Sequence, residues 1–144
     1  MKIKIITKLD WPSFRNVAML VDKALKTHSN CTIHDWTRAK PGGNILFIGT
    51  VFHQTLNFLS TFVKQSNVVF YGTTEGHSFV DETSIEIASQ VKIVAVSNFV
   101  KQMLEESGIR VAGVVHHGLD VNDQRVNIPS VSYTHLTLPT KRIV

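Results

Sequence analysis

The sequence predicts an α/β domain built on a mostly parallel sheet with helices on both faces. Three short apolar runs, Asn44–Thr50, Asn67–Gly72 and Lys92–Ser97, are typical of strands buried on both faces. Stretches with apolar residues at helical spacing alternate with these runs. Alternating strands and helices form βαβ units, whose right-handed crossovers put helices on both faces of one sheet.

The first part of the chain contains one weak connection. Lys2–Thr7 is a short β-rich run, and Ser13–Thr27 has helical spacing with Pro12 at its start. Cys31–Trp36 is a second candidate strand. Only Thr37–Gly43 joins it to the next strand, whereas a parallel crossover usually needs about a dozen residues. Either Cys31–Trp36 is a poor strand, or the chain turns there without a helix.

Further helices and a last strand follow the buried runs. The predicted helices are 52–65, Asp81–Gln90 and Asn98–Ser107, and the predicted last strand is Val111–His116. The third of these helices has the clearest ends. Ser97 or Asn98 can cap its start, and Gly108 lies just past its end, where a left-handed residue is favoured.

Composition points to one domain without a membrane span. Of 144 residues, 43% are apolar, which is enough for a core, and 18% are charged, too few for a disordered chain. No apolar run approaches the roughly 20 residues that span a bilayer, and the N-terminus does not resemble a signal peptide. We therefore expect a cytoplasmic protein, in agreement with its single cysteine, Cys31. The pattern indicates a domain over 1–120 and a disordered tail over 121–144.

The charge distribution argues against a nucleic-acid partner. The formal net charge is +4, but no cluster of five or more basic residues occurs. A mixed solvated surface is the simplest interpretation. Weak attraction to an anionic membrane surface or to a nucleotide is the second.

Ligands of open α/β sheets bind beyond the carboxyl ends of the strands. Polar, small or aromatic residues follow the predicted ends. The candidates for substrate binding are Asp10, Trp11, Thr50, Thr74, Gly76, Ser97, His117 and Gly118. The Trp11 ring is equally suited to stacking on a sugar or base and to packing against the protein.

The loop Gly72–Ser78, with the sequence GTTEGHS, is the strongest candidate site. Its glycines allow close approach of the backbone to a ligand. Glu75 can act as a base or bind sugar hydroxyls, and His77 can shuttle a proton near neutral pH. The alternative is an ordinary polar turn. No metal or cofactor is expected, because neighbours such as His116 and His117 on a strand point to opposite faces and no phosphate loop or GxGxxG motif is present.

The stretch Lys92–Asp120 resembles the end of the N-terminal domain of GT-B glycosyltransferases, most closely the retaining group called family 4 or group 1. The matching positions are Ser97, Phe99, Leu104, Gly108, Val115, Gly118, Leu119 and Asp120. Upstream, the YGTTEGHSF segment resembles the loop that lines the acceptor side of the cleft in that family. The first strand departs from the family pattern, because KLDWPS stands where a glycine-rich loop is frequent.

The resemblance implies a Rossmann-like fold and one half of a sugar-transferring enzyme. The N-terminal half binds the sugar or lipid acceptor, and the other half holds most contacts to the nucleotide-sugar donor. Catalysis in the family usually needs no metal, and many members are peripheral membrane proteins. Either Glu75 or His77 takes the place of the family's histidine. Because the donor half is missing, we expect the isolated chain to be inactive.

The C-terminal stretch of the sequence has a separate interpretation. From Ser132 onward the sequence resembles the translated adapter found at the ends of some artificially truncated reading frames. The alternative is a natural β-hairpin or tail. For the domain itself, a free-standing flavodoxin-like module that binds a small anion remains an alternative function, and an interaction protein for nucleic acid is a weaker one.

Overall fold

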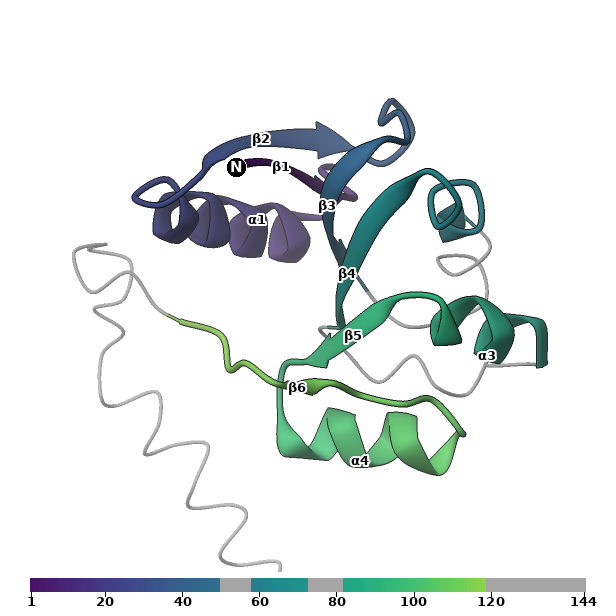
Figure 1. Cartoon of the computed structure of the whole chain (residues 1–144). Coiled ribbons are helices and arrows are strands. Elements are labelled where there is room, and N and C mark those ends of the chain that lie inside the picture. The colour runs from purple at the N-terminus through teal and green to yellow at the C-terminus, as the bar shows by residue number, and fades with distance from the viewer. Residues whose placement is uncertain (50–57, 73–81, 119–144) are drawn as a thin grey trace, which may run out of the picture.

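The described strands form one six-stranded sheet in which every pair is parallel (Figure 1). This computed structural model describes residues 1–49, 58–72 and 82–118, so the predicted tail lies outside it. The elements are β1 (Lys2–Thr7), α1 (Pro12–Leu25), β2 (Asn30–Asp35), β3 (Gly43–Gly49), β4 (Ser66–Gly72), α3 (Glu82–Ser89), β5 (Lys92–Ala95), α4 (Asn98–Glu106) and β6 (Gly113–Val114). The strand order is β2-β1-β3-β4-β5-β6.

The sheet separates two hydrophobic cores, because side chains alternate between its faces along each strand. On one face α1 packs through Ala18 onto Ile5. On the other face, Phe47 and Phe70 stack with ring centroids 5.4 Å apart, in the same core as Leu104 of α4. Helices therefore cover both faces, which confirms the predicted fold class of a Rossmann-like α/β sheet.

The connection between β2 and β3 contains no helix, which resolves the weak link in favour of a true second strand. β2 pairs with β1 over its whole length, from Lys2 opposite Asn30 to Thr7 opposite Asp35. The chain then returns across the sheet in an irregular segment whose Trp36 and Ala39 pack against the larger core. A large indole thus covers the sheet where a crossover helix usually does.

Three predicted elements are shorter than the sequence pattern indicated. β5 ends at Ala95 because the next residues turn into α4, and β6 is confined to Gly113–Val114 at the edge of the sheet. An edge strand has one neighbour, and here that neighbour is itself short. Of the predicted helix 52–65, residues 58–59 are helical and 60–65 form turns, while its first part lies outside the described residues.

The end of α4 has the glycine conformation that the sequence predicts, whereas the start of α1 lacks a side-chain cap. Gly108 adopts φ +85°, the left-handed conformation expected just past α4. Beside it, the Ile109 N–H donates to the Leu104 carbonyl at 2.9 Å. At α1, Pro12 occupies the first turn as predicted, but the residue at the cap position is Trp11, whose side chain makes no capping hydrogen bond.

Candidate functional site

The strand ends that precede the predicted site residues lie on one edge of the sheet. Parallel register places Gly49 beside Gly72, Gly72 beside Ala95, and Ala95 beside Val114. The segments that follow β3, β4, β5 and β6 therefore leave from the same carboxyl edge. Thr7 and Asp35 end the remaining two strands at that edge. As the sequence predicts, the carboxyl ends of all described strands lie at the same edge of the sheet.

The strand order locates a topological switch point between β1 and β3. The chain moves from β1 to β2 on one side, and then from β3 to β6 on the other. α1, which follows β1, packs on one face of the sheet, whereas Leu59 and Phe62, which follow β3 in the sequence, pack on the other. Doubly wound sheets bind ligands beyond the strand ends at such a switch point. Lys8–Trp11 join β1 to α1 at this switch point. Thr50, which follows β3, lies outside the described residues.

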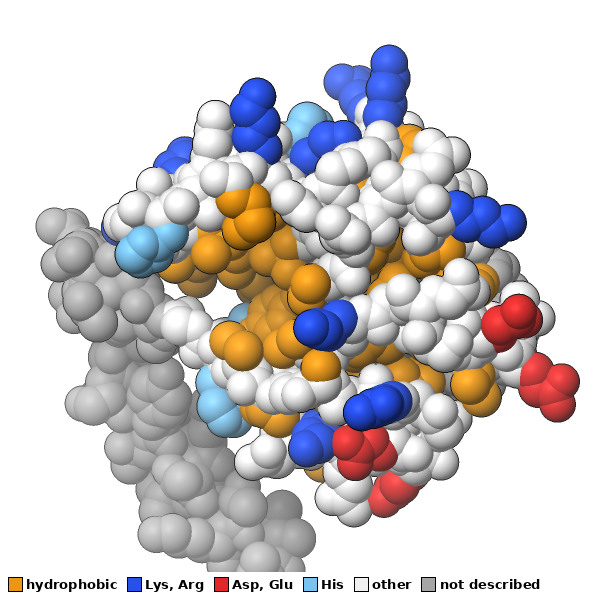
Figure 2. All heavy atoms as spheres, viewed as in Figure 1, with side chains coloured by type: hydrophobic (Ala, Val, Ile, Leu, Met, Phe, Trp, Pro, Cys, Tyr) orange, Lys and Arg blue, Asp and Glu red, His pale blue; other side chains and the backbone are white. Residues whose placement is uncertain are grey.

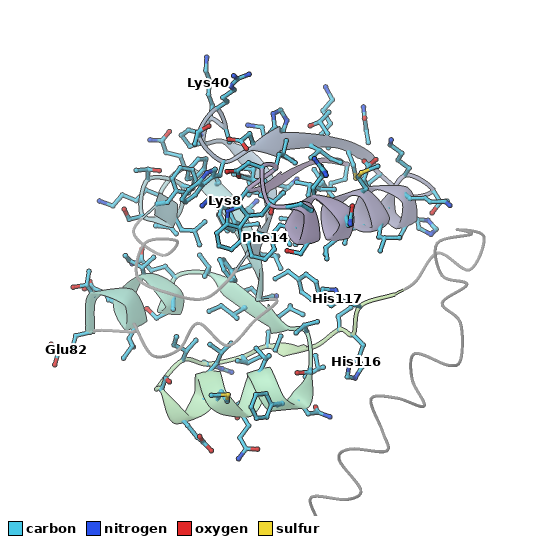
Figure 3. All side chains as sticks on the ribbon, turned by 180° about the vertical axis from the view of Figure 1, so that it is seen from behind. Lys8, Phe14, Lys40, Glu82, His116 and His117 are labelled. Carbon is cyan, nitrogen blue, oxygen red and sulfur yellow. The ribbon has the colours of Figure 1, made fainter. Side chains whose placement is uncertain are left out.

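A lysine held between two indoles lies at this switch point. Lys8 Nζ is 4.4 Å from the ring centroid of Trp11 and 5.1 Å from that of Trp36. On the same side of the molecule, Phe14 stacks on the Trp11 ring with centroids 5.2 Å apart, and Figure 3 shows Lys8 and Phe14 close together at the start of α1. We call Lys8, Trp11 and Trp36 the tryptophan–lysine cluster.

The backbone under the cluster is fixed by Asp35 at the end of β2. One carboxylate oxygen of Asp35 accepts from the Leu9 N–H at 3.1 Å, and the other accepts from the Thr37 N–H at 3.0 Å and from its hydroxyl. The hydrogen bond from the Thr37 hydroxyl is the largest influence that lowers the pKa of Asp35 below its ordinary value of 3.8. Asp35 is therefore ionised at neutral pH and ties the loop after β1 to the end of β2.

The predicted site residues divide into three groups. Asp10 and Trp11 lie in the β1 loop, with Asp10 exposed and Trp11 42% exposed. The catalytic candidates Glu75 and His77 lie outside the described residues. So do Thr50, Thr74 and Gly76. Ser97 follows β5, and His117 and Gly118 follow β6. Sequence reasoning missed Lys8 and Trp36 as site residues, although both directly follow strands.

Ser97 has a structural role at the start of α4. Its hydroxyl oxygen accepts a hydrogen bond from the Val100 N–H at 3.2 Å, which caps the helix. This confirms the predicted cap. The same hydroxyl was a candidate for substrate binding, and that role stays a prediction.

Replacing Ser97 with alanine should reduce the free energy of unfolding by about 1 kcal/mol, because the first turn of α4 loses its side-chain acceptor. Urea unfolding followed by circular dichroism would measure the loss. Ser97→Asp, which supplies another capping oxygen, is the control and should retain most of the stability. A loss of the same size in both variants would contradict the capping role.

His117 and Gly118 line an apolar groove on the α1 face of the sheet. Its volume is about 430 Å³, and Figure 2 shows hydrophobic side chains exposed in the hollow beside α1. The lining residues are Val17, Leu20, Val21, Ala24, Leu25, Leu46, Val69, Tyr71, Val94, Val115, His116, His117 and Gly118. The groove exists because α1 covers only the β2-β1-β3 side of this face.

A tyrosine–histidine pair closes the polar end of the groove. The Tyr71 hydroxyl donates to the Val115 carbonyl at 2.6 Å and lies 3.4 Å from His117 Nδ1. The two rings meet edge to face, with centroids 5.6 Å apart. Burial lowers the pKa of His117 below its ordinary value of 6.5 and raises that of Tyr71 above 10.0. Both side chains are therefore predominantly neutral at pH 7.

The described residues offer neither a metal cluster nor a membrane span. Among residues 1–49, 58–72 and 82–118, no three His, Cys, Asp or Glu side chains gather closely enough to hold an ion. None of the helices within those ranges is long and apolar enough to cross a bilayer.

Fold and site together define the class to which this chain belongs: a Rossmann-like α/β protein with a doubly wound parallel sheet. Comparison with known proteins adds no narrower assignment. The sequence matches no protein-family model and no curated protein.

Proposed function

We propose that this chain is the acceptor-binding half of a GT-B glycosyltransferase. Joined to a donor-binding half, it would transfer a sugar from a nucleotide-sugar donor to a lipid, polysaccharide or other acceptor. The observation on which the proposal chiefly depends is the common carboxyl edge. The segments after β4, β5 and β6 all begin there, and they include the loop with Glu75 and the residues His117 and Gly118.

The β5-α4-β6 unit supports the fold part of the proposal. Three positions of the glycosyltransferase-like stretch have structural roles here. Ser97 caps α4, Leu104 is 1% exposed in the core, and Gly108 ends the helix in the left-handed conformation. These residues explain why the stretch folds as strand, helix and strand. The functional part of the proposal rests on the segments after β4, β5 and β6, which all begin at the carboxyl edge of the sheet.

The proposed reaction needs a base on the acceptor side. An acceptor hydroxyl oxygen forms the new bond to the anomeric carbon, while the bond from that carbon to the nucleotide diphosphate breaks. The proton of the hydroxyl passes to Glu75 or His77, and the diphosphate leaves with the electron pair of the broken bond. Asp10, exposed at the same edge, is suited to accept hydrogen bonds from sugar hydroxyls.

A saccharide-binding experiment with the whole chain tests the proposal. An array of defined oligosaccharides is probed with the labelled protein, and any retained sugar is titrated into ¹⁵N-labelled chain. We expect amide shifts confined to the carboxyl edge, from Lys8–Trp11 and the residues after β4 and β6. Glu75→Gln and His77→Ala should weaken binding, whereas Lys92→Ala, at the opposite edge, should not. An array without any retained sugar would count against the proposal.

One observation favours the second candidate, a free-standing flavodoxin-like module that binds a small anion. The order β2-β1-β3-β4-β5 is the flavodoxin-type order, to which β6 adds one edge strand. The two candidates differ in the ligand that they require. The module would bind a phosphate-type anion with no saccharide attached, and the oligosaccharide array would remain empty.

A further inference from the structure

We infer that the tryptophan–lysine cluster is a binding site for a phosphate or diphosphate group, with Lys8 as the residue that contacts it. The inference goes beyond the proposed function, because it holds for a sugar-transferring half and for a free-standing module alike. Its basis is the placement of a cation directly after β1, at the switch point of the strand order between β1 and β3.

Two aromatic rings position the Lys8 side chain, which makes no hydrogen bond to another described residue. Two indole rings hold its ammonium group, with Nζ 4.4 and 5.1 Å from their centroids, and such cation–π contacts position a charge. A lysine ammonium has three donors. Within the described residues, none of them makes a hydrogen bond, and no carboxylate lies within ion-pair distance of Nζ. Of the three donors, those that do not face an indole ring have no partner among the described residues and can contact an oxyanion.

The Asp35 carboxylate, at the end of the neighbouring strand β2, is already engaged by other groups. Asp35 accepts hydrogen bonds from the backbone N–H groups of Leu9 and Thr37. The Trp36 N–H donates to the Thr7 carbonyl at 3.0 Å and the Trp11 N–H donates to the Lys8 carbonyl at 3.2 Å, so the backbone is held on both sides of Lys8. This arrangement fixes the position of the cation before a ligand arrives, which reduces the entropic cost of binding.

The surroundings favour an anion over a bare sugar. Phe14 stacks on the Trp11 ring and Lys8 Nζ lies over it, so protein groups already occupy the surface that a sugar would use for stacking. The α1 helix begins beside the cluster without a side-chain cap, and its positive end adds to the field of Lys8. The interpretation of Trp11 as a packing residue is therefore favoured, with the added role of positioning Lys8.

The chain offers a direct readout of this site. Trp11 and Trp36 are its only two tryptophans, and both belong to the cluster. Intrinsic tryptophan fluorescence therefore reports on the proposed site alone. The probe is inorganic pyrophosphate, titrated at constant ionic strength, with chloride as the matched non-specific anion. We expect a saturable change in emission with pyrophosphate and none with chloride.

Variants assign the binding to Lys8. Lys8→Met should weaken pyrophosphate binding at least roughly tenfold, since hydrogen bonds to a charged group are lost. Lys8→Arg keeps the charge and should bind within about threefold of the original chain. Lys40→Met is the control, because its side chain is exposed and projects away from the cluster in Figure 3. That control should bind as the original chain does.

The outcomes separate this inference from the proposed function. Equal affinity of the original chain and Lys8→Met for pyrophosphate, with both folded by circular dichroism, would overturn the inference, as would an emission change that never saturates. Pyrophosphate binding that depends on Lys8, combined with an empty oligosaccharide array, would support this site while contradicting the glycosyltransferase proposal. If sugars are retained on the array but pyrophosphate does not bind, the glycosyltransferase proposal is supported and the phosphate site is contradicted.

Discussion

Replacing Phe70 with alanine is expected to lower the free energy of unfolding by about 3–5 kcal/mol. Phe70 lies in β4, near the middle of the sheet, and is 0% exposed. Its ring stacks on Phe47 with centroids 5.4 Å apart. Truncation removes a large apolar side chain and leaves a cavity that strands bonded on both sides cannot close. Since domains of this size are stable by only about 5–15 kcal/mol, urea unfolding should show a much lower midpoint.

The matched control for this prediction is Phe99→Ala. Phe99 is in α4 and 60% exposed, so the same chemical change should alter the free energy of unfolding by no more than about 0.5 kcal/mol. Both variants can be measured in one urea series by far-ultraviolet circular dichroism. Equal losses in the two variants would mean that the ring of Phe70 is not packed as described.

Thr7→Val is expected to cost about 1–3 kcal/mol, although valine has nearly the same shape as threonine. Thr7 ends β1 and is 0% exposed. Its hydroxyl donates to the Ile48 carbonyl of β3 at 2.7 Å and so links the two strands at the switch point. Valine removes the donor and leaves a buried acceptor with one partner fewer. Thermal and urea unfolding should both report the loss.

Thr61→Val provides the comparison, because the Thr61 hydroxyl donates to a carbonyl too, that of Phe58 at 2.9 Å, but in an exposed position. Water can replace an exposed bond, so the expected change is within about 0.5 kcal/mol. If Thr7→Val were as stable as the original chain, the hydrogen bond between β1 and β3 would not contribute to stability.

The elements that the sequence predicted best are those with local signals. The run Ile45–Ile48 is apolar throughout, and the strand predicted around it, Asn44–Thr50, is β3 at Gly43–Gly49. Gly108 ended α4 in the conformation expected of it. The last strand was predicted too long because an apolar run does not reveal how many neighbours a strand has. β6, at the edge, pairs only with the short β5.

The candidate site was predictable only in part, for a related reason. The rule that ligands bind at carboxyl ends led to Asp10 and Trp11, which do lie in the loop after β1, and their binding role stays a prediction. The role of Lys8 depends on Trp36 lying beside it, and this contact exists because β2 neighbours β1. Strand order is a property of the whole sheet, so no local pattern around Lys8 could indicate it. Ser97 was predicted both as a cap and as a ligand residue, and the hydrogen bond to Val100 accounts for the first role.

The interior position of β1 has a consequence for how the protein assembles during synthesis. β1 leaves the ribosome before the other strands of this sheet, yet it bonds to β2 on one side and to β3 on the other. The unit β1-α1-β2 can form early, but the inner edge of its first strand stays open until Asn44–Phe47 emerge and dock. An open strand edge invites pairing with other chains. Slow translation before β3 should therefore increase misassembly more than a pause after it.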